Sequence, residues 1–137
     1  KRCVVVGAGP CGLYAAIELR LLGARVTVAE RREAFTRINQ LHLWQWCGDE
    51  IKALGARCLE PPPQDFGANP DLLSIAIGDL QALLLKTALM LGVEVFLGAE
   101  FVNIDHSGGS WRVHLRHAAR STRITPDPPT ALADVGL

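Results

Sequence analysis

One short segment, Gly7-Ala8-Gly9-Pro10-Cys11-Gly12, constrains the fold of this chain more than any other part of the sequence. It follows a continuous apolar run, Cys3 to Val6, which is typical of a strand buried on both faces. An apolar helical stretch from Leu13 to Leu22 comes next, and Gly23 ends it. Arg25 to Glu30 is rich in β-branched residues and indicates a second strand. The pattern predicts a Rossmann-type strand–turn–helix–strand unit with parallel strands.

The spacing of the loop glycines suits a nucleotide diphosphate. Gly7 permits a tight turn, Gly9 leaves room for a pyrophosphate, and Gly12 lets helix and strand pack closely. The free N–H groups and the positive end of the helix dipole would then face the phosphates. Glu30 stands eighteen positions beyond Gly12, where a carboxylate can accept hydrogen bonds from ribose hydroxyls. Its charge disfavours a 2′-phosphate, so we predict an ADP site that excludes NADP; FAD and NAD share this half, and both remain open.

A weak internal repeat extends the sheet. Leu21–Val28 resembles Met90–Leu97, since each contains a helix end, a glycine and a strand. The second copy follows a helix expected from Asp79 to Leu91, which predicts three parallel strands. Glu100–Ile104 and Trp111–Leu115 flank a turn-forming segment and predict a C-terminal β-hairpin. The expected fold class is α/β.

The stretch from Arg31 to Asn69 is expected to be long and irregular, with one short helix from Asp49 to Leu54. Loops of this length in compact domains usually bind a ligand or lack order. The aromatic residues His42, Trp44 and Trp46 either border a bound ring or pin the loop to the core, and we favour the second interpretation.

Composition limits the class of protein. The 137 residues suit one domain, which we assign to residues 1–120, followed by an irregular tail at 121–137. A hydrophobic content of 49% suits a parallel sheet covered on both faces. Fourteen basic and fourteen acidic residues cancel, so we expect no nucleic-acid partner. The apolar runs are too short to cross a bilayer, so we expect a cytoplasmic protein without membrane contact. Because the chain starts directly on a strand, we expect it to belong to a longer protein.

The four cysteines form no CxxC pair and no metal-ligand spacing. We expect Cys3, Cys11, Cys47 and Cys58 to be small buried hydrophobes in a reducing compartment, and we predict no metal site.

Beyond the glycine loop, several segments closely resemble the MICAL flavoprotein monooxygenases, over roughly residues 1 to 105. The most specific is Glu30-Arg31-Arg32-Glu33-Ala34-Phe35-Thr36-Arg37-Ile38-Asn39, followed by Leu41-His42-Leu43-Trp44. The other matching segments are Gly7–Leu13, Ala15–Leu19, Leu21–Val26, Leu80–Lys86 and Leu91–Val95.

The resemblance implies FAD as the cofactor and a partial FAD-binding domain, incomplete relative to that of the family. It implies cofactor binding by Gly7, Gly9, Cys11, Gly12, Glu30, Arg31, Arg32, Arg37 and Asn39. Arginine suits phosphate or ring contacts, because its planar fork is always charged. The alternative is a solvated loop in which the arginines pair with Glu33.

The family oxidises methionines of filamentous actin with NADPH as reductant, and the flavin carries the chemistry, so we name no catalytic residue. The resemblance therefore implies NADPH and filamentous actin as partners of a longer protein, with this segment inactive alone. Two other functions stay open: an FAD-dependent hydroxylase or oxidoreductase acting on a small molecule, and a non-catalytic dinucleotide-binding or interaction fragment. Gly78 favours the last, because the family carries an arginine there.

Overall fold

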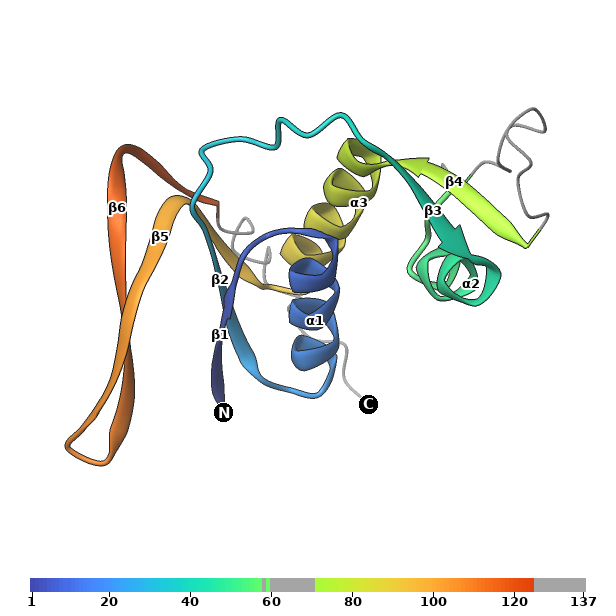
Figure 1. The fold of residues 1–137 in the computed structure, drawn as a ribbon. Helices are drawn as coiled ribbons and strands as arrows, with labels where there is room; N and C mark the ends of the chain where they lie inside the picture. Colours follow the sequence, from blue (N-terminus) through green and yellow to red (C-terminus); the bar gives the residue numbers. More distant parts are fainter. Residues whose placement is uncertain (58, 60–70, 125–137) are drawn as a thin grey trace, which may run out of the picture.

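A computed structural model describes residues 1–57, 59 and 71–124 of the chain. Figure 1 shows the arrangement of its helices and strands. In chain order these are β1 (Arg2–Val6), α1 (Pro10–Leu21), β2 (Arg25–Glu30), β3 (Gln40–Trp44), α2 (Gln45–Ala53), β4 (Leu72–Ala76), α3 (Ile77–Met90), β5 (Glu94–Ser107) and β6 (Ser110–Ile124).

The main sheet has the strand order β1-β2-β5-β6. β1 pairs with β2 in parallel, β2 pairs with β5 in parallel, and β5 pairs with β6 antiparallel. The predicted α/β fold, with three parallel strands and a C-terminal hairpin, is confirmed. The expected third parallel strand and first hairpin strand form one continuous strand, β5. β6 continues to Ile124, beyond the expected boundary at residue 120, and residues 125–137 lie outside the described residues.

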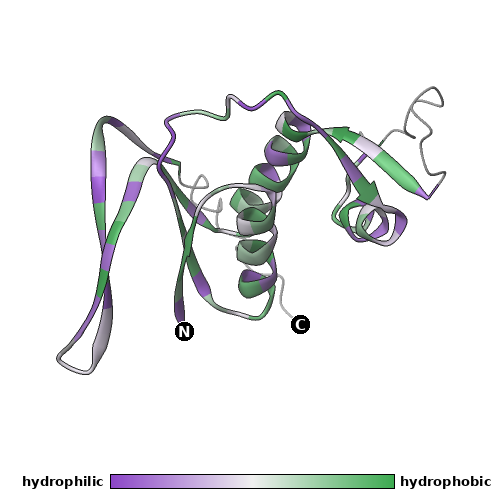
Figure 2. Cartoon of the chain, in the orientation of Figure 1, coloured by the Kyte–Doolittle hydropathy of each residue, from purple (hydrophilic) through white to green (hydrophobic). Residues whose placement is uncertain are grey.

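Helices α1 and α3 pack against one face of this sheet (Figure 1). Val26, Val28 and Val95 point from the strands into a core that also contains Leu13 of α1 and Leu84 of α3. In Figure 2, hydrophobic residues dominate α1, α3 and the parallel strands beside them. Burial of these side chains is the main stabilising contribution to the unit that carries the glycine loop.

The opposite face of the sheet is open among the described residues. Side chains alternate between the two faces of a strand, so Val4 and Val6 point away from the helices. Their exposed fractions are 43% and 55%. The expectation of a sheet covered on both faces is therefore wrong for the described part, because the described helices cover one face only.

Both predicted glycine stops are confirmed. Gly23 and Gly92 have φ values of +85°, the left-handed conformation that ends many helices. After α1, the amide of Ala24 donates to the carbonyl of Leu19 at 3.0 Å. The equivalent bond after α3 runs from Val93 to Ala88 at 2.9 Å, so the same cap leads into β2 and β5.

The prediction of an irregular stretch from Arg31 to Asn69 is wrong in part. β3 and β4 form a separate antiparallel sheet, and α2 follows β3 directly. Leu41 and Leu43 of β3 pack against the core. The alternate side chains, including the 54% exposed Trp44, face outward. His42 and Trp46 are also exposed, so the favoured interpretation of these aromatic residues as pins to the core is wrong.

The prediction that the cysteines are buried is wrong for the three that the structure describes. Cys11 is exposed, and Cys3 and Cys47 are half-buried free thiols. Cys58 lies outside the described residues. Cys11 is exposed because it stands on the first turn of α1, beside the glycine loop and away from the packed face.

Candidate functional site

The glycine loop joins β1 to α1 through a turn that only small residues permit. Gly7 has φ +98° and donates its amide hydrogen to the carbonyl of Ala29 at 2.8 Å. A Cβ at Gly12 would lie 2.0 Å from the carbonyl oxygen of Gly7, whereas a Cβ at Gly9 would meet nothing within 4 Å. The predicted close packing at Gly12 is thus confirmed. Gly9 leaves open space, and its contact with a ligand remains a prediction.

The N-terminus of α1 has the properties of an anion site. Gly9 is the N-cap and supplies no side-chain hydrogen bond, Pro10 follows, and the first turn has no acidic residue. The first amides of a helix lack acceptors within the helix, so those of Cys11 and Gly12 are available to a ligand. Together with the helix dipole, they favour a negatively charged group in front of the loop.

Glu30, the last residue of β2, is buried and fixed by two backbone amides. Its Oε2 accepts a hydrogen bond from the amide of Ala8 at 2.8 Å, and its Oε1 accepts one from the amide of Arg32 at 2.8 Å. The Arg32 guanidinium lies 3.8 Å from Oε1. An ionised carboxylate has about four acceptor positions, so Glu30 keeps capacity for ligand hydroxyls.

Gln81 of α3 holds the other side of Ala8. Its Nε2 donates to the carbonyl of Ala8 at 3.0 Å. The side-chain oxygen Oε1 is buried and has no hydrogen-bond partner among the described residues. Buried polar atoms are almost always paired, so this acceptor is an exception beside the loop.

These groups line one cavity of about 190 Å³, whose walls come from the loop, β2, the segment after it, and α3. Its lining residues are Gly7, Gly9, Glu30, Arg32, Phe35, Thr36, Arg37 and Gln81. The volume lies below the ~300–1,000 Å³ of typical ligand pockets, so the cavity suits part of a dinucleotide.

The structure brings together five of the nine residues predicted from the sequence: Gly7, Gly9, Glu30, Arg32 and Arg37. Gly12 packs behind the loop, Cys11 lines a different cavity, and Arg31 and Asn39 are exposed outside the lining.

Sequence reasoning did not assign Phe35, Thr36 and Gln81 to the site. The available signal for Gln81 was a polar residue between the buried positions Leu80 and Leu84 of an apolar helix. The aromatic and hydroxyl side chains of Phe35 and Thr36 gave no comparable signal.

The segment after Glu30 runs past the start of α3. The carbonyl of Asn39 accepts a hydrogen bond from the amide of Ile77 at 2.9 Å. A Cβ at Gly78 would lie 4.0 Å from the carbonyl oxygen of Arg37, which is an unstrained contact. A side chain at position 78 would therefore start beside the Arg37 segment.

Cys11 lines a second, apolar cavity of about 320 Å³ between α1, α2, β3 and α3. Tyr14 and Cys47 share this lining, and the hydroxyl of Tyr14 donates to Glu50 Oε2 at 3.3 Å. Burial raises the pKa of the Cys47 thiol above its ordinary value, and the charge of Glu50 raises it further. Burial and the same carboxylate also raise the pKa of Tyr14. Both groups are therefore neutral near pH 7, which suits an apolar surface.

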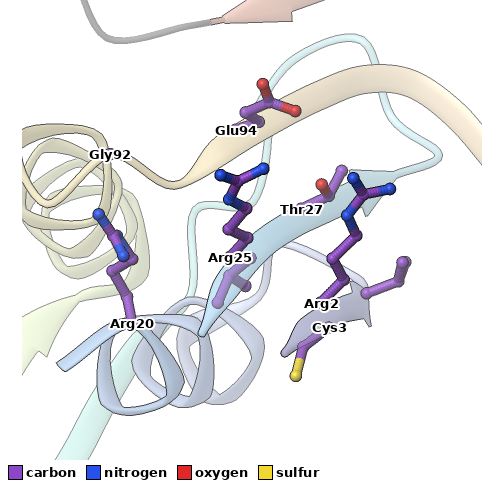
Figure 3. A pocket seen from close by; sticks show the side chains of 9 residues that line it. Arg2, Cys3, Arg20, Arg25, Thr27, Gly92 and Glu94 are labelled. Carbon is purple, nitrogen blue, oxygen red and sulfur yellow. The ribbon is translucent and has the colours of Figure 1, made fainter. Parts of the chain in front are cut away.

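A larger cavity, of about 560 Å³, lies at the amino ends of the parallel strands, away from the glycine loop. Figure 3 shows Arg2 and Arg25 extending toward the same side of the sheet. Glu94 in this lining pairs with Arg123 at 2.5 Å. The cavity shares no lining residue with the one beside the glycine loop.

Two features are absent from residues 1–57, 59 and 71–124: a cluster of metal ligands and a membrane-spanning helix. No group of three or more His, Cys, Asp or Glu side chains could hold a metal ion in this part of the chain. No helix within it is long and apolar enough to cross a membrane.

The chain is similar in sequence to known oxidoreductases. Residues 1–61 match the pyridine nucleotide-disulphide oxidoreductase family. The chain is 44% identical over 137 residues to the [F-actin]-monooxygenase MICAL1 of Rattus norvegicus, covering 96% of this chain. It is 47% identical over 127 residues to the protein-methionine sulfoxide oxidase mical3b of Danio rerio, covering 88% of this chain. It spans 12% and 7% of these two relatives. The resemblance found in the sequence is confirmed.

Solved structures share the fold. AlpK superimposes with a TM-score of 0.67 at 26% identity, over 90% of this chain and 29% of that chain. PyrE3, a Diels-Alderase of pyrroindomycin biosynthesis, has a TM-score of 0.68 at 17% identity, over 90% and 30%. CabE, an aromatic hydroxylase from angucycline biosynthesis, has a TM-score of 0.65 at 24% identity, over 90% and 29%. The last two likenesses concern the fold alone.

Proposed function

The chain is a homologue of the MICAL monooxygenases, and on that premise we propose that it binds the ADP half of FAD at the glycine loop. The observation that carries the proposal is the pairing of an uncapped helix N-terminus with a buried carboxylate at the end of the neighbouring strand. The first group suits a diphosphate and the second suits ribose hydroxyls. The helix N-terminus follows β1 and the carboxylate ends the adjacent parallel strand β2, so the two groups can bind the diphosphate and the ribose of one nucleotide.

The residues present fit such a group in three respects. The Cβ direction of Gly9 is open, which leaves room for a pyrophosphate against the backbone. The buried Oε1 of Gln81 lacks a partner among the described residues. Arg32 and Arg37 border the cavity and supply positive charge opposite a diphosphate.

We assign each group a binding role. The amides at the start of α1 bind the diphosphate. Glu30 orients the ribose and disfavours a 2′-phosphate. Arg32 and Arg37 bind the phosphates or stack on a ring. The segment from Arg31 to Asn39 then covers the cofactor. When bound, a flavin supplies the redox and oxygen-transfer chemistry. The protein supplies position and exclusion of water.

The activity belongs, in this proposal, to a longer protein. NADPH would serve as the reductant. Methionines of filamentous actin would be the substrate, since the names of the two relatives refer to F-actin and to protein methionine. The present chain contributes the ADP-binding part.

A calorimetric titration of the chain with FAD, NADH and ADP tests the proposal. Tighter binding of FAD than of ADP would indicate that the segment from Arg31 to Asn39 contributes contacts beyond the shared half. Equal affinity for FAD, NADH and ADP would reduce the proposal to a general adenine-nucleotide site. Absence of binding by all of them at millimolar concentration would refute it.

One observation favours a second candidate, a non-catalytic dinucleotide-binding segment. Gly78 opens toward the Arg37 segment without a side chain, where an arginine would add a charge. Such a protein would bind ADP and FAD equally and weakly. The same titration separates the two candidates.

A further inference from the structure

Gln81 is the polar side chain that connects α3 to the glycine loop. It is only 6% exposed and lies between buried leucines of an otherwise apolar helix face. Its amide group meets the carbonyl of Ala8, seventy-three positions away in the sequence. A buried amide in an apolar helix carries a desolvation cost, so its hydrogen bonds must offset that cost.

Only one end of this amide is satisfied. Nε2 donates to Ala8 at 3.0 Å, while Oε1 has no partner among the described residues. The residue lines the cavity that Gly7, Gly9 and Glu30 also line. A buried, unpaired acceptor in a residue that lines a cavity is suited to a donor that enters with a ligand.

The same residue fixes the loop. Ala8 is fully buried, its amide donates to Glu30, and its carbonyl accepts from Gln81. The peptide groups on both sides of Ala8 are therefore held by two elements that lie on either side of the cavity. Loss of either bond would let the loop rotate away from the geometry that a diphosphate requires.

We propose that Gln81 is a ligand-binding and loop-positioning residue of the dinucleotide site. Its Oε1 accepts a hydrogen bond from an O–H group, and its Nε2 holds the glycine loop in the binding conformation. The inference rests on the proposed function for its ligand, and extends it to α3. Because a diphosphate has no donor at neutral pH, the O–H group is a hydroxyl of the nucleotide or a water molecule bound between Gln81 and the phosphates.

The substitution Gln81→Met tests both parts, since methionine has a similar length and forms no strong hydrogen bond. We expect FAD affinity to fall about tenfold, the effect of losing one to two hydrogen bonds. Thr87→Val is the matched control, because it removes the hydrogen bond from Thr87 to Leu83 on the same helix, away from the loop. Its FAD affinity should stay within about twofold of the unchanged chain.

Titration with ADP separates the two sources of the donor. An equal loss for ADP and FAD indicates that Gln81 acts at the shared half, by positioning the loop or by accepting from a hydroxyl or a water molecule there. A loss confined to FAD indicates a hydroxyl outside that half. Unchanged affinity of Gln81→Met for both, with a melting temperature lowered as in Thr87→Val, would overturn the proposal and leave Gln81 a structural residue.

Two further measurements cover the other outcomes. If Gln81→Met does not fold, Gln81→Glu replaces it, because glutamate has the same size as glutamine. The FAD affinity of this variant should be low at pH 8. It should recover at low pH, where a protonated carboxyl can donate to Ala8. A pH-independent affinity would contradict the proposal. If the unchanged chain binds no nucleotide, the proposed function fails and ligand binding by Gln81 fails with it. The positioning role then stands only if the hydrogen-bonded amides of Gly7, Ala8 and Leu13 exchange faster in Gln81→Met than in Thr87→Val.

Discussion

The amide nitrogen of Ala8 lies 2.8 Å from Oε2 of Glu30, so the carboxylate at the end of β2 fixes the glycine loop that follows β1. The bond joins adjacent parallel strands at their carboxyl ends, where open α/β sheets bind ligands. Glu30 thus shapes the loop in addition to the ribose contact that we propose for it.

Replacing Glu30 by Ala should lower both stability and affinity. The amide of Ala8 would lose its buried acceptor, which costs about 1–3 kcal/mol in the free energy of unfolding. Loss of the ribose contact should weaken FAD binding by roughly 1.5–3 kcal/mol. Urea unfolding without ligand measures the first effect, and calorimetry under folded conditions measures the second. A loss of binding free energy below a few tenths of a kcal/mol would show that the ribose does not contact Glu30.

Gly9→Val should abolish nucleotide binding while the fold persists. A Cβ at this position meets no protein atom within 4 Å, and Gly9 already has the extended backbone of an ordinary N-cap, with φ −69°. The added side chain would occupy the space assigned to the pyrophosphate. Far-UV circular dichroism should stay unchanged, and titration should show no saturable FAD binding. Unchanged FAD affinity of Gly9→Val would show that the pyrophosphate does not bind at Gly9.

Gly12→Ala should have the opposite pattern, because the obstacle there is the protein itself. The new Cβ would lie 2.0 Å from the carbonyl oxygen of Gly7, which is backbone and cannot rotate away. We expect a loss of about 1–3 kcal/mol or more in the free energy of unfolding. Urea denaturation of Gly9→Val and Gly12→Ala in parallel gives the comparison. Equal stability of the two variants would contradict this account of the loop.

Local signals in the sequence predicted the part of the fold that holds the loop. Gly23 and Gly92 marked both helix ends, and the apolar runs before the glycine loop and after these two glycines marked the parallel strands. These features depend on backbone conformation and side-chain period, which neighbouring residues determine. Of the nine candidate residues, Gly7, Gly9, Gly12 and Glu30 followed from the glycine motif. The other five followed from the resemblance to the MICAL family, and five of the nine share one cavity.

Contacts between distant segments could not be predicted in this way. β3 pairs with β4 across a long separation, and β3 alone offers only five alternating residues, Gln40 to Trp44. The bond from Gln81 to Ala8 likewise depends on how α3 packs beside the loop. Such pairings follow from tertiary packing, which short-range patterns do not contain.

Cys47 should react slowly with alkylating reagents near neutral pH. Burial and the charge of Glu50 raise its pKa above the ordinary value of 9.0, so less of the reactive thiolate is present at a given pH. Its rate of labelling by iodoacetamide, measured by mass spectrometry, should rise with pH through a midpoint above 9.0. Glu50→Gln should lower that midpoint without restoring the ordinary value, because burial is the larger cause. A midpoint unaffected by this change would exclude Glu50 as a contributor.

Gly78→Arg should strengthen FAD binding. A Cβ at this position would lie 4.0 Å from the carbonyl oxygen of Arg37, so a side chain can start there without strain, beside the segment assigned to the cofactor. A guanidinium bound to a phosphate or ring oxygen contributes about 1.5–3 kcal/mol, which corresponds to an affinity about tenfold higher or more. Replacing glycine by arginine or alanine also stabilises α3 by up to about 1 kcal/mol, so Gly78→Ala is the control that carries the helix effect without the charge. Calorimetry should give tighter FAD binding for Gly78→Arg than for Gly78→Ala, and melting temperatures should rise in both. If the two variants bind FAD equally, the start of α3 lies outside the reach of the cofactor, and the site is confined to the ADP half.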